Sequence, residues 1–334
     1  MPAKIEGEGK SRGQSTMQNT QYADAAVLLL DRRQAVRKQT RSVLNVLGFK
    51  TFLKFGDLAE ARIALNNLRV DLIILDLGGE DCGALGLVGD VRGRRLGLDP
   101  FVPILLTTWD AKLKALRPVM SSGADDVLLF PFSTAQMGQR IEALVRHRKP
   151  FVISEDYFGP DRRGTTELEK DTTSITVPNA LRARVEGRPD AAPNAARIEE
   201  TLIELRRLKL RNVARRIWYL ADKLKSALSD PSLPDRYERE LTTLQTSISI
   251  YNKTLIPGDS VDLNALCDAL SGVLAGLFGR PPVQKGLELL EKNALALRVA
   301  SKLDREPDEL VAAISDEVAK VGKIQAELVR TVLG

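Results

Sequence analysis

Short apolar runs alternate with amphipathic stretches along the first half of the chain. Because runs that are apolar throughout are buried on both faces, they predict parallel strands between two layers of helices. We therefore predict a five-stranded, doubly wound α/β domain over residues 23–148, with its functional site at the carboxyl ends of the strands. The predicted strands are residues 27–31, 50–55, 70–76, 102–108 and 126–130, and the predicted helices are residues 33–47, 57–68, 84–95, 111–122 and 134–148.

The rest of the chain falls into two segments that differ in composition and in the spacing of apolar residues. Residues 149–195 are rich in Pro, Gly, Thr and Asp, which predicts a linker with short ordered pieces. From residue 196 to 334 apolar residues recur at a spacing of three and four, which predicts an all-helical interaction domain with late helices at 283–303 and 308–332. A helix bundle is the expected arrangement, and a coiled-coil homodimer is the alternative. The clearest apolar series is Tyr237, Leu241, Leu244, Ile248, Tyr251 and Leu255.

Composition narrows the class of protein. Apolar residues make up 43% and charged residues 28% of the chain, and the net charge is +5, as in ordinary globular proteins. Residues 1–22 have no apolar core, so we expect a disordered tail rather than a signal peptide, and a cytoplasmic protein without a membrane segment. Cys82 and Cys267 fit no metal-ligand spacing, and His147 is the only histidine. No catalytic constellation or phosphate-binding loop is visible, so we expect no enzymatic activity.

Four residues at the ends of predicted strands form a pattern. Asp31 follows the first strand, Asp76 closes the third, Thr108 closes the fourth and Pro131 follows the fifth. Their order and spacing resemble the receiver domain of two-component response regulators over residues 25–148. The resemblance implies that Asp76 is the phosphoacceptor, that Asp31 and Asp76 hold Mg²⁺, and that Thr108 and Pro131 belong to the switch.

Other positions depart from that family. Arg32 stands where the second acid belongs, Phe130 replaces the lysine before the proline, and Trp109 replaces a small residue. Val127 stands at the aromatic switch position. A guanidinium cannot bind a cation and repels one. We therefore expect phosphorylation at Asp76 to be weakened or lost, with neither a metal nor another cofactor.

The role of Arg32 allows two interpretations. In the first, Arg32 is a fixed counter-ion for Asp31 and Asp76, which predicts a lowered pKa for Asp76. In the second, Arg32 points to solvent. The alternative function is a conventional phospho-switch, in which Mg²⁺ binds at Asp31 and Asp76 and phosphorylation of Asp76 controls the helical output.

A compact motif lies in the predicted linker. Gly-Pro favours a turn, the two aromatic residues can anchor on an apolar surface, and the arginines can pair with carboxylates. The motif is interpreted either as a docking segment, for the receiver's own surface or for a partner, or as a plain linker turn. Its residues are Tyr157, Phe158, Gly159, Pro160, Asp161, Arg162 and Arg163.

The expected partners are proteins, including a sensor kinase or a signalling complex. A DNA-binding transcriptional regulator is the second alternative, because residues 297–314 have a spacing similar to a helix-turn-helix. Nucleic acid is disfavoured because the would-be recognition helix carries Asp308, Glu309, Asp316 and Glu317, which repel phosphates. The basic stretch 206–216 favours an acidic protein partner.

Overall fold

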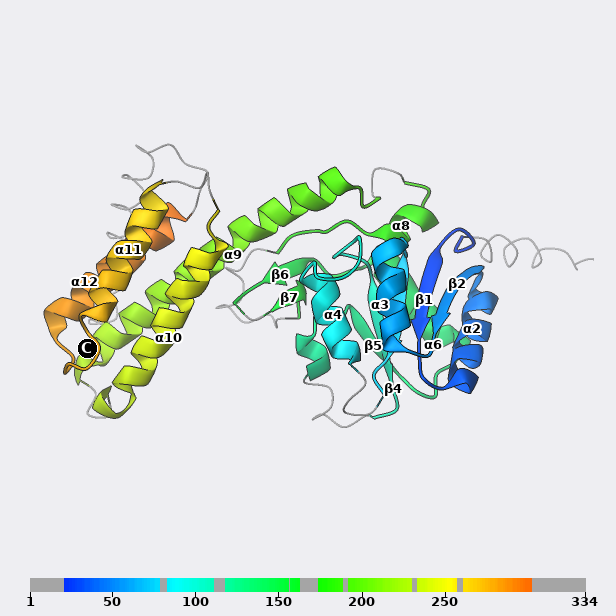
Figure 1. Ribbon diagram of the computed structural model, residues 1–334, viewed down its shortest axis with the longest axis horizontal. Coiled ribbons are helices and arrows are strands. Elements are labelled where there is room, and N and C mark those ends of the chain that lie inside the picture. Colours follow the sequence, from blue (N-terminus) through cyan, green and yellow to red (C-terminus); the bar gives the residue numbers. More distant parts are fainter. Residues whose placement is uncertain are drawn as a thin grey trace, which may run out of the picture. The chain divides into compact units, whose positions relative to one another are not determined.

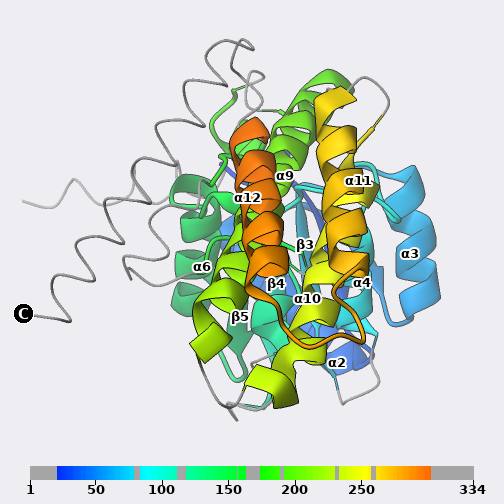
Figure 2. The ribbon, with the colours of Figure 1, turned by 90° about the vertical axis from the view of Figure 1, so that its left-hand side faces the viewer.

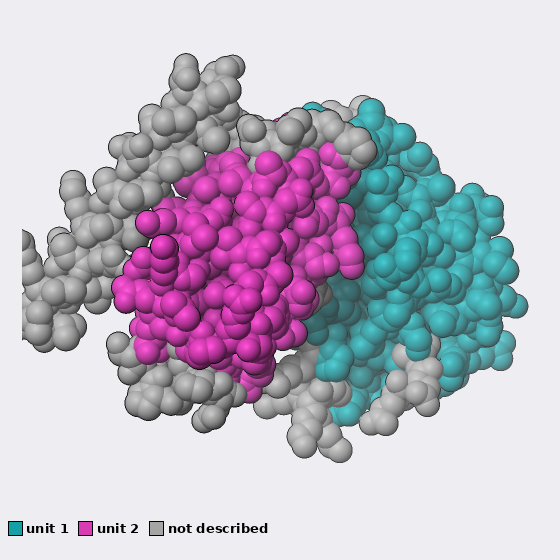
Figure 3. Space-filling view, turned by 60° about the vertical axis from the view of Figure 1, so that its left-hand side comes forward, with its two compact units in different colours: residues 1–152, 156–203 teal, residues 153–155, 204–334 magenta. Residues whose placement is uncertain are grey.

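The computed structural model describes residues 21–78, 83–110, 118–155, 157–162, 174–188, 192–229, 233–256 and 261–301. The chain divides into two compact units (Figure 3). The first consists of residues 1–152 and 156–203, and the second of residues 153–155 and 204–334.

The first unit contains the predicted parallel sheet, with strand order β2-β1-β3-β4-β5 (Figure 1). This order and the all-parallel pairing confirm the doubly wound fold. The helix predicted over residues 111–122 lies mostly outside the described residues. The strands are β1 (Ala26–Leu30), β2 (Thr51–Phe55), β3 (Leu72–Asp76), β4 (Ile104–Thr108) and β5 (Asp126–Leu129), and the flanking helices are α2 (Gln34–Leu47), α3 (Leu58–Asn67), α4 (Ala84–Arg92) and α6 (Thr134–Arg146).

Alternate residues of each central strand point to opposite faces of the sheet, and both faces are covered. Leu28 and Ile73 belong to the apolar cluster that contains residues of α3 and α4. Val27 and Ile74 belong to a second cluster with residues of α2 and α6. The uniformly apolar runs in the sequence reflect this burial from both sides.

Segments outside the predicted limits 23–148 also belong to the first unit. Tyr22, assigned to the disordered tail, is buried and stacks on Phe49 with 4.6 Å between ring centroids. Phe151 and Leu181, assigned to the linker, are 0% exposed. The assignment of Tyr22 to the tail was wrong, whereas the predicted linker does contain short ordered pieces, some of whose apolar side chains are buried in the first unit. Their elements are β6 (Phe151–Ile153), β7 (Phe158–Pro160) and α8 (Ala180–Val185).

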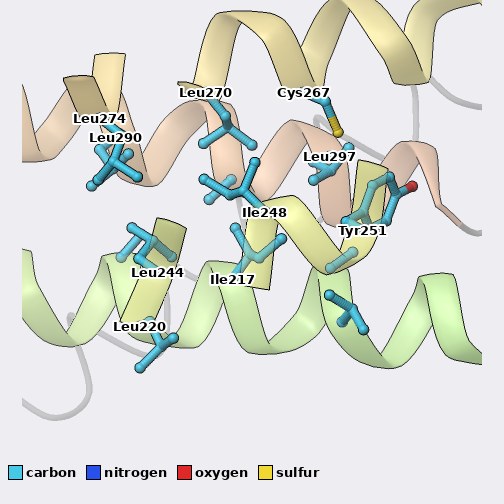
Figure 4. Packing of buried hydrophobic residues seen from close by; sticks show 14 of the residues in the cluster. Ile217, Leu220, Leu244, Ile248, Tyr251, Cys267, Leu270, Leu274, Leu290 and Leu297 are labelled. Carbon is cyan, nitrogen blue, oxygen red and sulfur yellow. The ribbon is translucent and has the colours of Figure 1, made fainter. Parts of the chain in front are cut away.

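The second unit is helical, as predicted. Its helices share one apolar core (Figure 4), and α11 and α12 lie side by side (Figure 2). The series Tyr237–Tyr251 is buried along one face of α10. The helix predicted at 283–303 is present as α12, whereas the one predicted at 308–332 and most of the helix-turn-helix-like stretch lie outside the described residues. The elements are α9 (Ala195–Ser226), whose residues up to Ile203 belong to the first unit, a 3₁₀ turn η2 (Ala227–Ser229), α10 (Leu233–Thr254), α11 (Val261–Ala275) and α12 (Gln284–Ala300).

None of the helices in the described part of the chain combines the length and the apolar character that crossing a membrane requires.

Candidate functional site

Two buried carboxylates meet at the carboxyl edge of the sheet. Strands β1 and β3 are neighbours, with Leu30 in register with Leu75. Each of these residues is followed directly by an aspartate, so Asp31 and Asp76 lie at the same edge. Both are buried, with exposed fractions of 3% and 8%. Two like charges held this close in a partly dry site destabilise each other unless a cation is present.

Arg33 supplies that cation. Its guanidinium lies 3.2 Å from Asp31 Oδ2 and 2.8 Å from Asp76 Oδ2, so one nitrogen, Nη2, bridges both carboxylates. The Arg33 Nε also donates to Asp31 Oδ1 at 3.2 Å. The side chain of Arg33 is 43% exposed, whereas the two carboxylates that it joins are almost inaccessible. The guanidinium therefore closes the pocket from its solvent side.

The interpretation of Arg32 as the counter-ion was wrong. Arg32 is exposed and forms no ion pair with a described residue, as the solvent-facing interpretation had it. The cause is local: Asp31 Oδ1 accepts a hydrogen bond from the backbone N–H of Arg33 at 2.7 Å, which is the turn that an aspartate forms with the second residue after it. That turn brings Arg33 back over the carboxylates and leaves Arg32 outside.

Aromatic rings cover the pocket beside the guanidinium. Trp109 stacks on Phe130, with centroids 4.8 Å apart and planes inclined by 8°. The carbon at the centre of the Arg33 guanidinium lies 5.4 Å from the centroid of the Trp109 ring, within cation–π range. Phe130 in turn contacts Phe132, with 4.3 Å between centroids. The two positions where the family has a small residue and a lysine thus form one aromatic stack on Arg33.

The pKa of Asp76 is raised above its ordinary value, and the predicted lowering was wrong. Burial is the main cause, followed by the negative charge of Asp31. The Arg33 charge and the backbone N–H of Gly78, 3.1 Å from Asp76 Oδ2, lower the pKa but do not offset the burial. An ion pair lowers an acid's pKa only when its charge outweighs the loss of hydration.

Ionised Asp76 therefore destabilises the fold, and Asp76→Asn is expected to raise the free energy of unfolding at neutral pH. Because the folded-state pKa lies above the unfolded value of about 4, the folded protein holds the proton more tightly, and the destabilisation develops as the pH rises through this interval. The difference between the wild type and Asp76→Asn should disappear in more acidic solution, where Asp76 is protonated in both states. Urea unfolding at several pH values measures this. A constant difference across the pH range would contradict it.

The two predicted switch residues occupy the expected places. Thr108 ends β4 and is buried, and its Oγ1 accepts a hydrogen bond from the backbone N–H of Asp110 at 3.1 Å. The residue in register with Asp76 is Thr107, not Thr108. Pro131 is exposed and follows Phe130 through a cis peptide bond. A functional role for Thr108 or Pro131 stays a prediction.

The donor set does not fit Mg²⁺, the ion that the fold family implies. Magnesium requires oxygen ligands in near-octahedral geometry. This pocket offers Asp31 and Asp76, and the guanidinium of Arg33 already bonds both carboxylates. In the described part of the chain, His, Cys, Asp and Glu nowhere gather in threes as metal ligands do. A cation entering here must first displace a fixed positive charge.

The linker motif docks on the receiver-like unit itself. Phe158 packs edge-on against Phe101 and Phe151, with centroid distances of 6.3 and 5.7 Å. Arg162 donates hydrogen bonds to the backbone carbonyls of Ala124 and Asp125. The described residues of the motif contact the first unit itself, and the choice between a docking segment and a plain linker turn stays a prediction. Arg163 lies outside the described residues.

Gly123 and Gly159, whose backbones approach each other closely, make this contact possible. Gly123 has φ +89°, and a Cβ built there would lie 2.5 Å from the carbonyl oxygen of Phe158. We expect Gly123→Ala to lower the free energy of unfolding by about 1–2 kcal/mol, because it adds both backbone strain and a clash. Gly86→Ala, in the interior of α4 with nothing within 4 Å, is the matched control and should be neutral or stabilising. Equal losses in both variants would show that the contact contributes nothing.

A buried ion network beneath the motif was not foreseen from the sequence. Asp125 pairs with Arg92 at 2.8 Å and with Arg148 at 2.7 Å, and the three side chains are 2%, 2% and 6% exposed. Both guanidinium groups lie over Phe151, at 5.2 Å and 4.9 Å from its ring centroid. Burial lowers the pKa of Arg92 to about 10, although the charge of Asp125 opposes the shift. In the sequence, these charged residues stand beside the ends of predicted elements, where exposed charged residues are common. That position gave no indication that they are buried and paired.

No protein-family model matches the chain. Among curated proteins, the chain is 30% identical over 151 residues to the phosphate regulon transcriptional regulatory protein PhoB of Rhizobium meliloti, covering 45% of this chain and 63% of that protein. It is 32% identical over 125 residues to the DNA-binding response regulator MtrA of Mycolicibacterium smegmatis, covering 37% of this chain and 51% of that protein. Among solved structures, the chemotaxis response regulator CheY4 of Vibrio cholerae is 23% identical and covers 35% of this chain and 96% of that chain, with a TM-score of 0.32.

The curated relatives, the strand order and the residues at the strand ends all indicate the same type of domain. Residues 25–148 form a receiver domain of the response-regulator type. The chain spans between about half and just under two thirds of the length of the two curated relatives. The comparisons assign no family to the C-terminal helical unit.

Proposed function

We propose that the chain is a cytoplasmic, non-enzymatic signalling protein that acts through protein–protein contacts and whose receiver domain has lost magnesium-dependent phosphorylation. The observation that carries the proposal is the bridge from Arg33 to Asp31 and Asp76. This bridge supplies internally the positive charge that a metal brings to a receiver domain.

Electrostatics favours the arginine over the metal. At about 4 Å, two unit charges interact with about 4 kcal/mol at an effective dielectric constant of 20. A divalent ion placed between the carboxylates would meet at least this repulsion from Arg33, in addition to losing its own hydration. Because the Arg33 Nε and Nη2 donate to Asp31, moving the side chain aside also breaks these hydrogen bonds. We therefore expect Arg33, and not a metal ion, to remain the counter-ion of Asp31 and Asp76.

The phosphoryl group would also lack its usual partners. Phe130, 7% exposed, replaces the lysine that neutralises the transferred group. Trp109 stacks on Phe130 in the place of the small residue that leaves room for phosphoryl entry. In this proposal the domain presents a fixed surface, and its helical unit binds a protein partner, such as a sensor kinase or another signalling protein.

Phosphorylation tests the proposal directly. The full chain is incubated with acetyl phosphate and Mg²⁺ and its intact mass is measured, with Arg32→Asp/Arg33→Ala/Phe130→Lys as a variant that restores the family's charges. We expect no phosphoryl adduct on the wild type and a detectable, Asp76-dependent adduct on the restored variant. Stoichiometric labelling of the wild type at Asp76 would support the conventional phospho-switch instead.

A further inference from the structure

One stretch of the first unit carries only positive charge. From residue 32 to residue 56 the sequence has no Asp or Glu. Arg33 is engaged by the two buried carboxylates, and Arg37 donates to the backbone carbonyls of Asp31 and Arg32. The basic residues of the stretch are Arg32, Arg33, Arg37, Lys38, Arg41, Lys50 and Lys54.

Four of these residues lie on α2, on β2 or directly before β2. The Arg41 guanidinium lies 5.6 Å from the ring centroid of Phe52 on β2. Lys38 is one helical turn before Arg41, and Lys54 is two residues after Phe52, on the same face of the strand. Lys50 directly precedes β2. We call Lys38, Arg41, Lys50 and Lys54 the basic seam.

The charges of the basic seam are not neutralised by the part of the chain that the structure describes. All four side chains belong to exposed residues. None of them forms an ion pair with a described residue. Acidic residues resume at Asp57, whose side chain caps α3 through the backbone N–H groups of Ala59 and Glu60. The basic seam therefore offers its full charge to a partner.

The strand beside the basic seam has an open edge. Strand β2 lies at one edge of the sheet and pairs only with β1 among the described strands. Its outer N–H and C=O groups can therefore accept another extended segment. Its two faces differ: Lys54 lies on the face toward α2, whereas Leu53 and Phe55, both half-buried, lie on the opposite face.

We propose that β2 and the basic seam bind an extended acidic segment of a partner protein, which adds to the sheet as a further strand. Glutamate or aspartate at alternate positions of the segment meets Lys54 and Arg41, and apolar residues between them cover Leu53 and Phe55. Lysines on an edge strand repel a second copy of the same strand. The same charges select a segment of opposite sign.

A protein segment fits this surface better than nucleic acid or a membrane. A phosphate backbone can accept hydrogen bonds, but it has no N–H groups for the carbonyls of an open strand edge and no apolar side chains for Leu53 and Phe55. The inference rests on the protein-interaction function proposed above, but it does not depend on the loss of magnesium chemistry. The two can fail separately.

The test uses the full chain and a fluorescein-labelled peptide of alternating glutamate and valine. Fluorescence anisotropy measures binding, and hydrogen exchange measures protection of the β2 amides. We expect binding with β2 protected, and about tenfold weaker binding to Arg41→Glu/Lys54→Glu, since two attractive charge pairs become repulsive. The control Lys149→Glu/Arg197→Glu makes the same change in net charge at exposed residues elsewhere and should bind as the wild type does.

Labelled duplex DNA and phosphatidylglycerol vesicles are the comparison probes. Binding of either in place of the peptide, no binding of any probe, or peptide binding without protection of β2 would each overturn the inference. Arg33→Ala should keep its affinity for the peptide. If the wild type binds the peptide and is also phosphorylated by acetyl phosphate, the inference stands while the proposed loss of phosphorylation fails.

Discussion

Asp125→Asn is expected to lower the free energy of unfolding of the first unit by about 3–5 kcal/mol, the largest effect predicted for this protein. The substitution keeps the shape of the side chain but removes the charge between Arg92 and Arg148, whose side chains are 2% and 6% exposed. Two buried guanidinium groups are then left close to each other without the carboxylate that pairs with both. Since domains are stable by about 5–15 kcal/mol in total, the loss is a large share of the total.

The neighbouring residue provides the control for this substitution. Asp126 pairs with Arg140 at 3.1 Å, but the side chains are 27% and 50% exposed. Surface pairs of this kind contribute at most about 1 kcal/mol, so Asp126→Asn should leave stability almost unchanged. Chemical denaturation of both variants gives the comparison. Similar small losses in the two would mean that the buried network does not stabilise the first unit.

Arg33→Ala is expected to lower the free energy of unfolding by about 2–3 kcal/mol at neutral pH. The substitution leaves Asp31 and Asp76 buried beside each other without a cation. The loss is smaller than that expected for a fully buried pair, because the Arg33 side chain is 43% exposed and solvent screens its charge. Added Mg²⁺ should restore part of the lost stability in this variant, since the two carboxylates then have no other counter-ion.

The adjacent arginine again serves as the control. Arg32 is exposed and pairs with no acid in the described structure, so Arg32→Ala should change stability by less than about 0.5 kcal/mol. Neither Arg32→Ala nor the wild type should gain stability from Mg²⁺ beyond a general salt effect. Thermal unfolding with and without the ion measures both. A larger loss in Arg32→Ala than in Arg33→Ala would reverse the assignment of the bridging residue.

The strands and their order followed from residue pattern, because burial on both faces leaves continuous apolar runs such as 72–76. The two carboxylates at the sheet edge were also predictable, since parallel strands end at one edge and each aspartate directly follows or closes its strand. The sequence did not predict which arginine bridges the two carboxylates. Neighbouring residues in a turn point in different directions, and the hydrogen bond from the Arg33 N–H to Asp31 Oδ1 decides between them.

Two further features, the pKa of Asp76 and the burial of Phe151, depend on contacts between residues that are far apart in the sequence. The sign of the Asp76 pKa shift is set by the balance between burial and the Arg33 charge, and exposure cannot be read from residue types alone. The stretch around Phe151 has the composition of a linker, yet Phe151 is buried beside the guanidinium groups of Arg92 and Arg148, which are far apart in sequence. The composition of that stretch reflects its many turn residues and does not reveal the few side chains that are buried.

The position of Arg33 is tested most directly by a magnesium titration that uses Trp109 as the reporter. Trp218→Phe leaves Trp109 as the single tryptophan, with the Arg33 guanidinium 5.4 Å from its ring centroid. We predict that the emission of Trp109 does not change with Mg²⁺ while Arg33 is present, and that it changes in a saturable manner once Arg33→Ala is added. Saturable binding with Arg33 in place would contradict the assignment of this arginine to the position of the metal.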